Sequence, residues 1–162
     1  MTVVTILGAG GKMGNRITKP LLETKKYQLR FVEKSEAGQA RIREAGLEIM
    51  DLDDALKGTD VVIFTTPDAL VRQISDEVVP KLDPGTKFLF LDPAAIAASR
   101  VKKREDISCF VCHPTHPPVF SLLGETDPAA RRDYWGGGLA TQALVFAIAW
   151  GTEEEADLVE TI

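Results

Sequence analysis

The chain has 162 residues, a length typical of one folded domain with a sizeable core. Hydrophobic residues make up 44% and charged residues 27%, which excludes disordered, collagen-like and coiled-coil chains. Nineteen basic and 24 acidic residues give a net charge of −5 without a basic stripe, and this argues against nucleic acid or an anionic membrane surface as the main partner.

Short runs of β-branched and aromatic residues alternate along the chain with helical patterns. Several of the strand-like runs lack in-out alternation, which is typical of strands buried on both faces. This alternation predicts βαβ crossovers and therefore an α/β fold with a doubly wound, mostly parallel sheet. Strands are predicted at residues 3–7, 29–32, 61–65, 87–91, 107–112 and 143–150. Helices are predicted at residues 12–24, 37–45, 52–57, 69–82 and, with a weaker pattern, 94–103.

Two features bear on the helix ends. Pro20 lies inside the first helical pattern and should kink that helix near Arg16 or limit its regular part. Near the C-terminus, Thr152 and Glu155 form the pattern of a capping box, which predicts that a further helix begins there.

A glycine-rich turn, residues 8–14, follows the first strand and opens the first helix. Its best register uses Gly8, Gly11 and Gly14, with Gly10 extra. Glycines here let backbone N–H groups approach a pyrophosphate, which the helix dipole also favours, although such a turn can simply allow close packing. Its place in the first βαβ unit favours dinucleotide binding. The expected cofactor contacts are Gly8, Gly10, Gly11, Lys12, Met13 and Gly14.

Glu33 ends the second predicted strand. A carboxylate there would accept hydrogen bonds from the adenine ribose and repel a 2′-phosphate, so NAD is favoured over NADP. Lys34 and Arg30 keep NADP open as an alternative, and a plain solvated charge is the non-functional interpretation of Glu33.

Two loops follow strands at the edge where open α/β sheets bind ligands. Thr65-Thr66-Pro67-Asp68 follows one strand and Asp92-Pro93 another, and proline ends each strand at the crevice. Asp68 fits a helix cap better than a ligand. Asp92 fits either role. The expected cofactor contacts in these loops are Thr65, Pro67, Asp68 and Asp92.

The two histidines, His113 and His116, are expected to follow the fifth strand in a proline-rich turn. A histidine can take a hydroxyl proton while a hydride leaves the same carbon, so both are candidate catalytic residues. His113 could instead hold a divalent metal ion with His116, or merely satisfy loop carbonyls. Cys109 and Cys112, three apart in a strand, point to opposite faces and are expected in the core, not in a metal site or disulfide.

Arg131 and Arg132 could grip a substrate carboxylate, although pairing with Asp127 or Asp133 is the simpler interpretation. No apolar run approaches the ~20 residues that cross a bilayer, and no signal peptide is recognisable. The sequence therefore predicts a cytoplasmic protein with a small-molecule ligand and no membrane partner.

These segments together resemble a known family. The turn Gly8-Ala9-Gly10-Gly11-Lys12-Met13-Gly14 looks like those of prephenate dehydrogenases, dihydrodipicolinate reductases and 3-hydroxyacid dehydrogenases. With Asp92-Pro93-Ala94-Ala95 and His113-Pro114-Thr115-His116-Pro117-Pro118 added, the whole chain is similar to apionate oxidoisomerases, which are phosphogluconate-dehydrogenase-like proteins. The His-Pro-x-His-Pro-Pro segment is the most specific part of this resemblance.

The resemblance implies a Rossmann domain over residues 1–151, with residues 152–162 beginning a helix that leads to a helical domain absent from this chain. It also implies NAD-dependent oxidation of a branched sugar acid coupled to rearrangement, and a homodimer in a full-length form. The glycine turn and Glu33 would hold NAD, while His113 and His116 would face substrate or a metal ion. One departure is Thr141-Gln142, where the family tends to have Lys-Gln.

The favoured hypothesis is an NAD-dependent oxidoreductase or oxidoisomerase acting on a hydroxy sugar acid such as apionate. One alternative is a non-catalytic NAD(P)-binding module or truncated domain. Another is an NADP-dependent reductase of the dihydrodipicolinate reductase or 3-hydroxyacid dehydrogenase type, although the histidine run of the former is missing.

Overall fold

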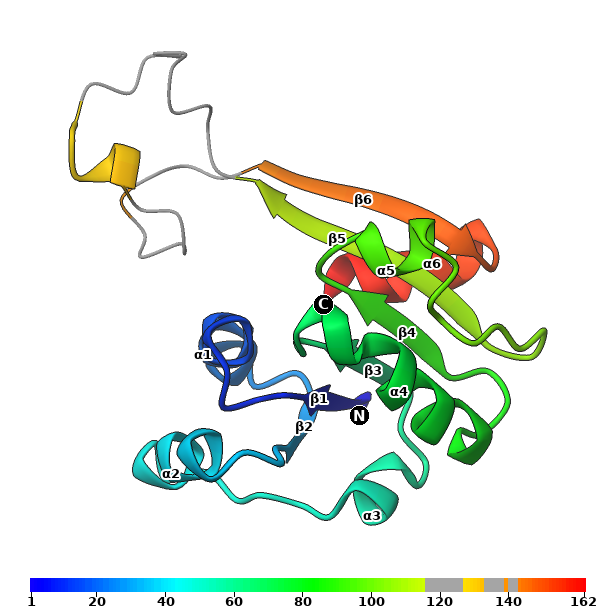
Figure 1. Ribbon diagram of the computed structural model, residues 1–162, viewed down its shortest axis with the longest axis horizontal. Coiled ribbons are helices and arrows are strands. Elements are labelled where there is room, and N and C mark those ends of the chain that lie inside the picture. Colours follow the sequence, from blue (N-terminus) through cyan, green and yellow to red (C-terminus); the bar gives the residue numbers. More distant parts are fainter. Residues whose placement is uncertain (116–126, 133–138, 140–142) are drawn as a thin grey trace.

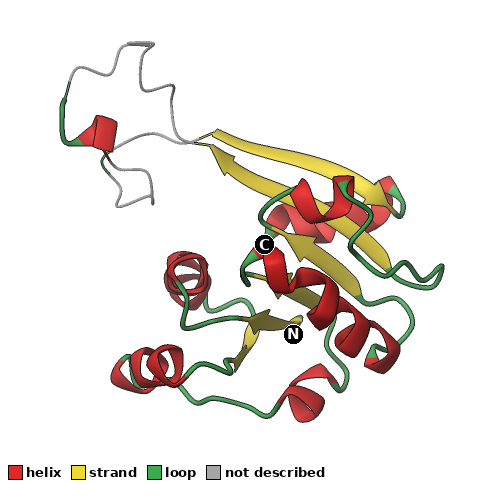
Figure 2. Cartoon of the chain, viewed as in Figure 1, coloured by secondary structure: helices red, strands yellow, loops and turns green. Residues whose placement is uncertain are grey.

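The computed structural model describes residues 1–115, 127–132, 139 and 143–162. A six-stranded sheet forms the centre of the molecule, with helices on both faces (Figures 1 and 2). The strand order is β2-β1-β3-β4-β5-β6, in which β1 to β5 are parallel and β6 runs antiparallel to β5. The strands are β1 (Val3–Leu7), β2 (Gln28–Val32), β3 (Val61–Phe64), β4 (Lys87–Phe90), β5 (Ser108–Thr115) and β6 (Ala143–Trp150). The predicted doubly wound α/β fold is confirmed.

Two apolar clusters hold the helices against the sheet. One cluster packs α1, α2 and α6 on one face, and the other packs α3, α4 and α5 on the opposite face. Within the second cluster, the rings of Phe64 and Phe90 stack at 4.5 Å between centroids, and Phe88 meets Phe64 edge-on. The helices are α1 (Lys12–Thr24), α2 (Glu36–Glu44), α3 (Leu52–Leu56), α4 (Asp68–Val78), α5 (Ala94–Ala97) and α6 (Glu153–Thr161), with 3-10 turns at Val79–Lys81 and Ala130–Arg132.

Two helices are shorter than predicted. The helix predicted to reach residue 82 ends at Val78, because Pro80 cannot continue it and the chain tightens into a 3-10 turn. The helix predicted at 94–103 is the single turn of α5, which ends where Ser99 adopts a left-handed φ of 52°. By contrast, α1 runs from Lys12 to Thr24 through Pro20, so the proline does not limit it. The predicted capping box of Thr152 and Glu155 is present.

β5 and β6 extend beyond the rest of the sheet as a long antiparallel pair (Figure 1). β6 is wholly apolar, yet most of it is exposed, with Leu144 at 67% and Val145 at 55%. Burial on both faces, expected for several of the apolar strands, therefore does not extend to β6, the edge strand of the sheet. It holds for β3, whose four residues are all buried.

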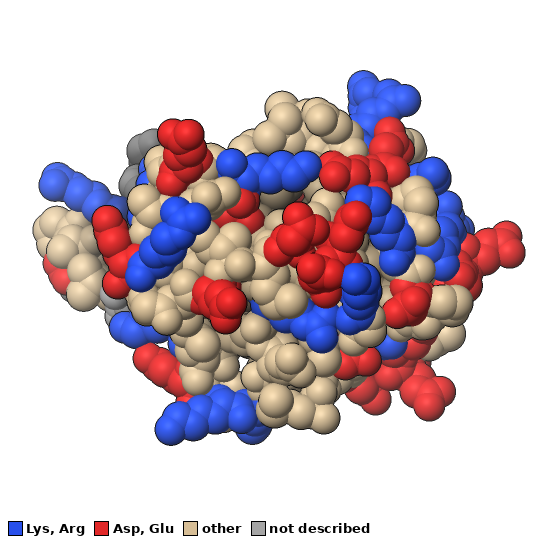
Figure 3. Space-filling model, turned by 90° about the horizontal axis from the view of Figure 1, so that it is seen from below, with Lys and Arg blue, Asp and Glu red and all other residues tan. Residues whose placement is uncertain are grey.

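The face seen in Figure 3 carries interspersed acidic and basic side chains without a continuous basic stripe, as the composition predicts. In the part of the chain that the structure describes, every helix is too short or too polar to cross a membrane.

The two cysteines allow a direct check of β5. Cys109 is fully buried and Cys112 partly buried, and burial raises the pKa of both thiols above the ordinary value. Because the thiolate is the nucleophile, we expect iodoacetamide at pH 8 to leave Cys109 unmodified in the folded protein and to label Cys112 slowly. Peptide mass spectrometry before and after unfolding in guanidinium measures the extent of labelling at each cysteine. Rapid labelling of native Cys109 would contradict the register of β5.

Candidate functional site

The glycine turn between β1 and α1 lies at the carboxyl end of the parallel strands. Gly8 has a φ of +80°, and its N–H donates to the Val32 carbonyl at 2.9 Å, which ties the turn to β2. A Cβ on Gly14 would lie 2.4 Å from the Ala9 carbonyl oxygen, so only glycine permits this tight turn.

The preferred register treats Gly10 as additional to the three glycines that the turn needs, but the structure requires glycine at this position too. A Cβ there would lie 2.3 Å from the carbonyl oxygen of Gly38 in α2. The two backbones therefore touch where α1 and α2 meet the sheet. The Arg41 side chain strengthens this junction by donating to the Gly10 carbonyl at 2.7 Å.

The start of α1 is suited to an anion. Its N-cap is Gly11, which has no side chain to cap the helix, and its first turn contains no acidic residue. The first N–H groups of a helix have no acceptor within the helix, and the dipole places partial positive charge there. Gly8 and Gly11 face a neighbouring pocket, whereas Gly10, Lys12 and Gly14 line neither of the two pockets described next.

The first pocket, of about 380 Å³, lies between the end of β2 and α4. Its walls are mostly apolar, with Leu52, Leu70 and Ile74 among them, and Glu33 lies beside the glycine turn. Lys34 and Glu77 form an ion pair at 3.0 Å on its lining. We call this space the distal pocket.

Glu33 is held firmly at the edge of the distal pocket. Its Oε2 accepts from the Gly10 N–H at 3.0 Å, and its Oε1 accepts from the N–H and the hydroxyl of Ser35, both at 2.9 Å. A carboxylate offers about four acceptor positions, so one position on Oε2 remains for a ligand hydroxyl.

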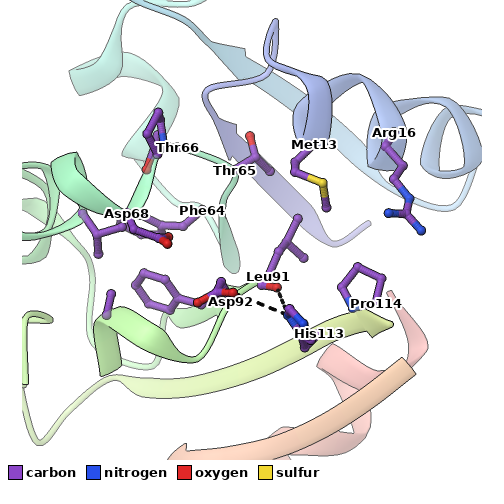
Figure 4. Close-up of a pocket in the computed structure, with 14 residues that line it drawn as sticks. Met13, Arg16, Phe64, Thr65, Thr66, Asp68, Leu91, Asp92, His113 and Pro114 are labelled. Atoms are coloured by element: carbon purple, nitrogen blue, oxygen red, sulfur yellow. Dashed lines mark hydrogen bonds and ion pairs between the residues drawn. The ribbon is translucent and has the colours of Figure 1, made fainter. Parts of the chain in front are cut away.

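The second pocket, of about 410 Å³, lies at the ends of β3, β4 and β5 and is called the proximal pocket (Figure 4). His113 Nδ1 is 2.8 Å from the carbonyl oxygen of Leu91. Because a carbonyl only accepts, Nδ1 carries a proton, and in the neutral form of the ring Nε2 is the acceptor. Asp92 Oδ2 lies 3.7 Å from the same Nδ1, while Asp92 Oδ1 accepts from the Ala94 N–H at 2.7 Å.

Thr65, Thr66 and Pro67 line both pockets and form their common wall. The Thr65 hydroxyl donates to the carbonyls of Leu7 and Gly8, at 2.8 and 3.0 Å, so it braces the glycine turn. The Thr66 hydroxyl is shielded from solvent and has no hydrogen-bond partner among the described residues. Because its hydroxyl is shielded, Thr66 lines the two pockets through its other atoms.

Asp68 lines the proximal pocket, but it does not cap α4 as expected. The N-cap of that helix is Pro67, and Asp68 is the first helical residue. A negative charge remains favourable there because it lies at the positive end of the helix dipole.

His113 does not follow β5 but lies inside it, paired with Val145 of β6. The strand continues through Pro114 because β4 pairs no further than Val111, so no neighbour on that side needs the missing N–H. His116 lies outside the described residues. Within the described ranges, no group of three or more His, Cys, Asp or Glu side chains is arranged to hold a metal ion.

The structure brings Met13, Thr65, Pro67, Asp68, Asp92 and His113 together around one pocket, and it adds residues that the sequence did not single out. Arg16, Ser35 and Thr66 are the additions. Arg131 and Arg132 line neither pocket and belong to the 3-10 turn at the far end of the β5–β6 connection, while Asp133 lies outside the described residues. Arg16 was detectable in principle, because it lies three residues after Met13 on the same side of α1.

Comparisons with known proteins agree with this geometry. Residues 2–121 match the family model described as "Acetohydroxy acid isomeroreductase, NADPH-binding domain". The chain is 44% identical over 160 residues to a D-apionate oxidoisomerase of Cupriavidus necator, with 98% of this chain and 57% of that protein covered. It is 42% identical over 163 residues to a D-apionate oxidoisomerase of Rhizobium rhizogenes, with 100% and 58% covered. The resemblance to apionate oxidoisomerases is thereby confirmed.

A solved structure is also similar. The crystal structure of a semialdehyde dehydrogenase NAD-binding protein from Cupriavidus necator, in complex with calcium and NAD, has a TM-score of 0.86 and 44% identity, and the match covers 99% of this chain and 58% of that one. The chain thus spans a little more than half the length of the relatives it matches.

Proposed function

This chain belongs to the family of acetohydroxy acid isomeroreductase NADPH-binding domains, and from that membership we propose that it is the nicotinamide dinucleotide-binding domain of an oxidoreductase acting on a hydroxy sugar acid such as D-apionate. One observation carries the proposal. Two pockets meet at the Thr65–Pro67 wall beside the uncapped start of α1, and the proximal pocket contains an oriented histidine. That arrangement suits a ligand with two halves joined by a diphosphate.

The residues fit a nicotinamide dinucleotide at this edge of the sheet. The adenosine half fits the distal pocket, where Glu33 has an acceptor position left for a ribose hydroxyl. The diphosphate fits the start of α1 beside Gly8 and Gly11. The nicotinamide half fits the proximal pocket beside Met13.

The bound nicotinamide supplies the hydride acceptor, and the protein's own residues manage the proton. With the Nδ1 proton directed at the Leu91 carbonyl, the His113 ring can accept the proton of a substrate hydroxyl at Nε2 while the carbon that carries this hydroxyl loses hydride. Asp92, 3.7 Å from Nδ1, stabilises the ring once it is charged. His113 therefore serves as general base and Asp92 as its electrostatic partner.

Glu33 favours NADH over NADPH, because a fixed carboxylate repels a 2′-phosphate. We expect Glu33→Gln to lower the ratio of the NADPH dissociation constant to the NADH dissociation constant by about tenfold, because the substitution removes the charge and keeps most of the hydrogen bonds. Fluorescence titration with NADH and with NADPH measures the two dissociation constants. Glu36→Gln removes the same charge from an exposed position nearby and should leave the ratio unchanged. An unchanged ratio in Glu33→Gln would contradict the specificity role.

The proposed activity is tested by assaying the chain with NAD and a panel of sugar acids and short hydroxy acids that includes D-apionate. NADH formation at 340 nm with at least one acid is the expected result. Binding of NADH without turnover of any acid would support a cofactor-binding module instead, and a chain that binds neither nucleotide would refute both.

A further inference from the structure

Arg16 contributes a guanidinium group to the lining of the proximal pocket. It lies on α1 one turn after Met13, and both side chains line that pocket. The side chain is partly buried, yet it has no hydrogen-bond or ion-pair partner among the described residues. Two other partly buried arginines differ: Arg30 donates to two carbonyls and Arg104 to two carbonyls and Asp106.

Arg16 faces the part of the pocket where the proposed chemistry takes place. Figure 4 shows its guanidinium extending from α1 toward Pro114 and His113 of β5. The base and the cation therefore come from opposite sides of one space of about 410 Å³. A small molecule in that space can meet both groups at once.

The other charged side chains that the described part of the chain places in this pocket are carboxylates. Asp92 is engaged by Ala94 and lies close to His113, and Asp68 lies in the first turn of α4. Neither of them attracts an anion. Among the described residues that line this pocket, Arg16 is therefore the one permanently charged cation that an anionic substrate can meet. A planar guanidinium holds a carboxylate through two parallel hydrogen bonds.

We infer that Arg16 binds the carboxylate of the substrate and so restricts the proximal pocket to hydroxy acids over neutral polyols. The inference rests on the proposed function and adds the residue that recognises the acid. It places the carboxylate at α1 and the reacting hydroxyl at His113 of β5. The two contacts together fix which hydroxyl of the acid lies against the base.

The test compares the wild-type chain with Arg16→Gln, Arg16→Lys and a control, Lys19→Gln. Lys19 is exposed on the same helix, so its loss changes the net charge equally without touching the pocket. Calorimetry with and without saturating NADH measures binding of D-apionate, of a panel of hydroxy acids with four to six carbons, and of the corresponding neutral polyols.

Wild-type protein is expected to prefer the acids to the polyols. Arg16→Gln should weaken acid binding by about tenfold to a hundredfold, with Arg16→Lys in between, and Lys19→Gln should match wild type. The NADH dissociation constant should change less than twofold in all variants. Acid binding that survives in Arg16→Gln, or a wild-type chain without a preference for acids, overturns the inference.

The nucleotide titration separates this inference from the proposed function. If Arg16→Gln weakens NADH binding and leaves acid binding unchanged, Arg16 contacts the cofactor and the inference is wrong, while the proposed function stands. If wild-type protein fails to bind NADH, the proposed function fails, whatever the acids do.

Discussion

Gly14→Ala is expected to abolish measurable NADH binding and to lower the free energy of unfolding by about 1–3 kcal/mol. The added Cβ would lie 2.4 to 2.6 Å from backbone atoms of Gly8 and Ala9, and no flexible side chain is available to move instead. The turn must therefore shift away from the start of α1. Calorimetric titration and urea unfolding of the same sample measure both effects.

A second glycine variant separates loss of stability from loss of the site. Gly46 has a φ of +73°, and a Cβ added there would have nothing within 4 Å. It lies away from both pockets at the end of α2. Gly46→Ala should cost about 1 kcal/mol of stability and leave the NADH dissociation constant unchanged. Wild-type affinity in Gly14→Ala would show that the turn does not shape the cofactor site.

His113→Asn is expected to lower kcat by about a hundredfold to ten-thousandfold on whichever acid the chain oxidises. Asparagine has an amide N–H near the position of Nδ1 and can still donate to the Leu91 carbonyl, but it cannot accept a proton at neutral pH. The NADH dissociation constant should change less than twofold, because the proposed contacts of the adenosine half and the diphosphate, at Glu33 and the start of α1, are unaltered. Steady-state kinetics together with NADH titration measure the two values.

Asp92→Asn gives a finer test of the same site. Asparagine keeps the oxygen that caps Ala94 and removes the charge 3.7 Å from His113. We expect kcat to fall by about tenfold, with the thermal midpoint nearly unchanged. A loss of stability as large as that of Asp92→Ala would mean that the residue acts through α5 and not through His113.

The sheet was predictable because its strands are short apolar runs separated by helical patterns. The glycine turn and Glu33 follow β1 and β2, and the predicted parallel pairing of these two strands places them together. The length of α5 was not predictable, because Ser99 ends it in a left-handed conformation that no local residue pattern announces.

The roles of site residues that depend on contacts between distant parts of the chain could not be predicted from the sequence. Glycine is needed at position 10 because Gly38 of another helix lies against it. Arg16 becomes a candidate site residue only because the end of β5 lies opposite α1. The position of His113 inside β5 depends on where β4 stops pairing. Each of these features is set by tertiary packing, which local propensity does not encode.

Backbone amide NMR of the ¹⁵N-labelled chain during titration with NADH tests the central claim most directly. Saturable shifts at Gly8, Gly11, Gly14 and Glu33, with further shifts at Thr66 and His113, are the predicted result. Shifts confined to other surfaces, or a spectrum that stays unchanged at millimolar NADH and NADPH, would contradict a dinucleotide lying from the end of β2 to the end of β5.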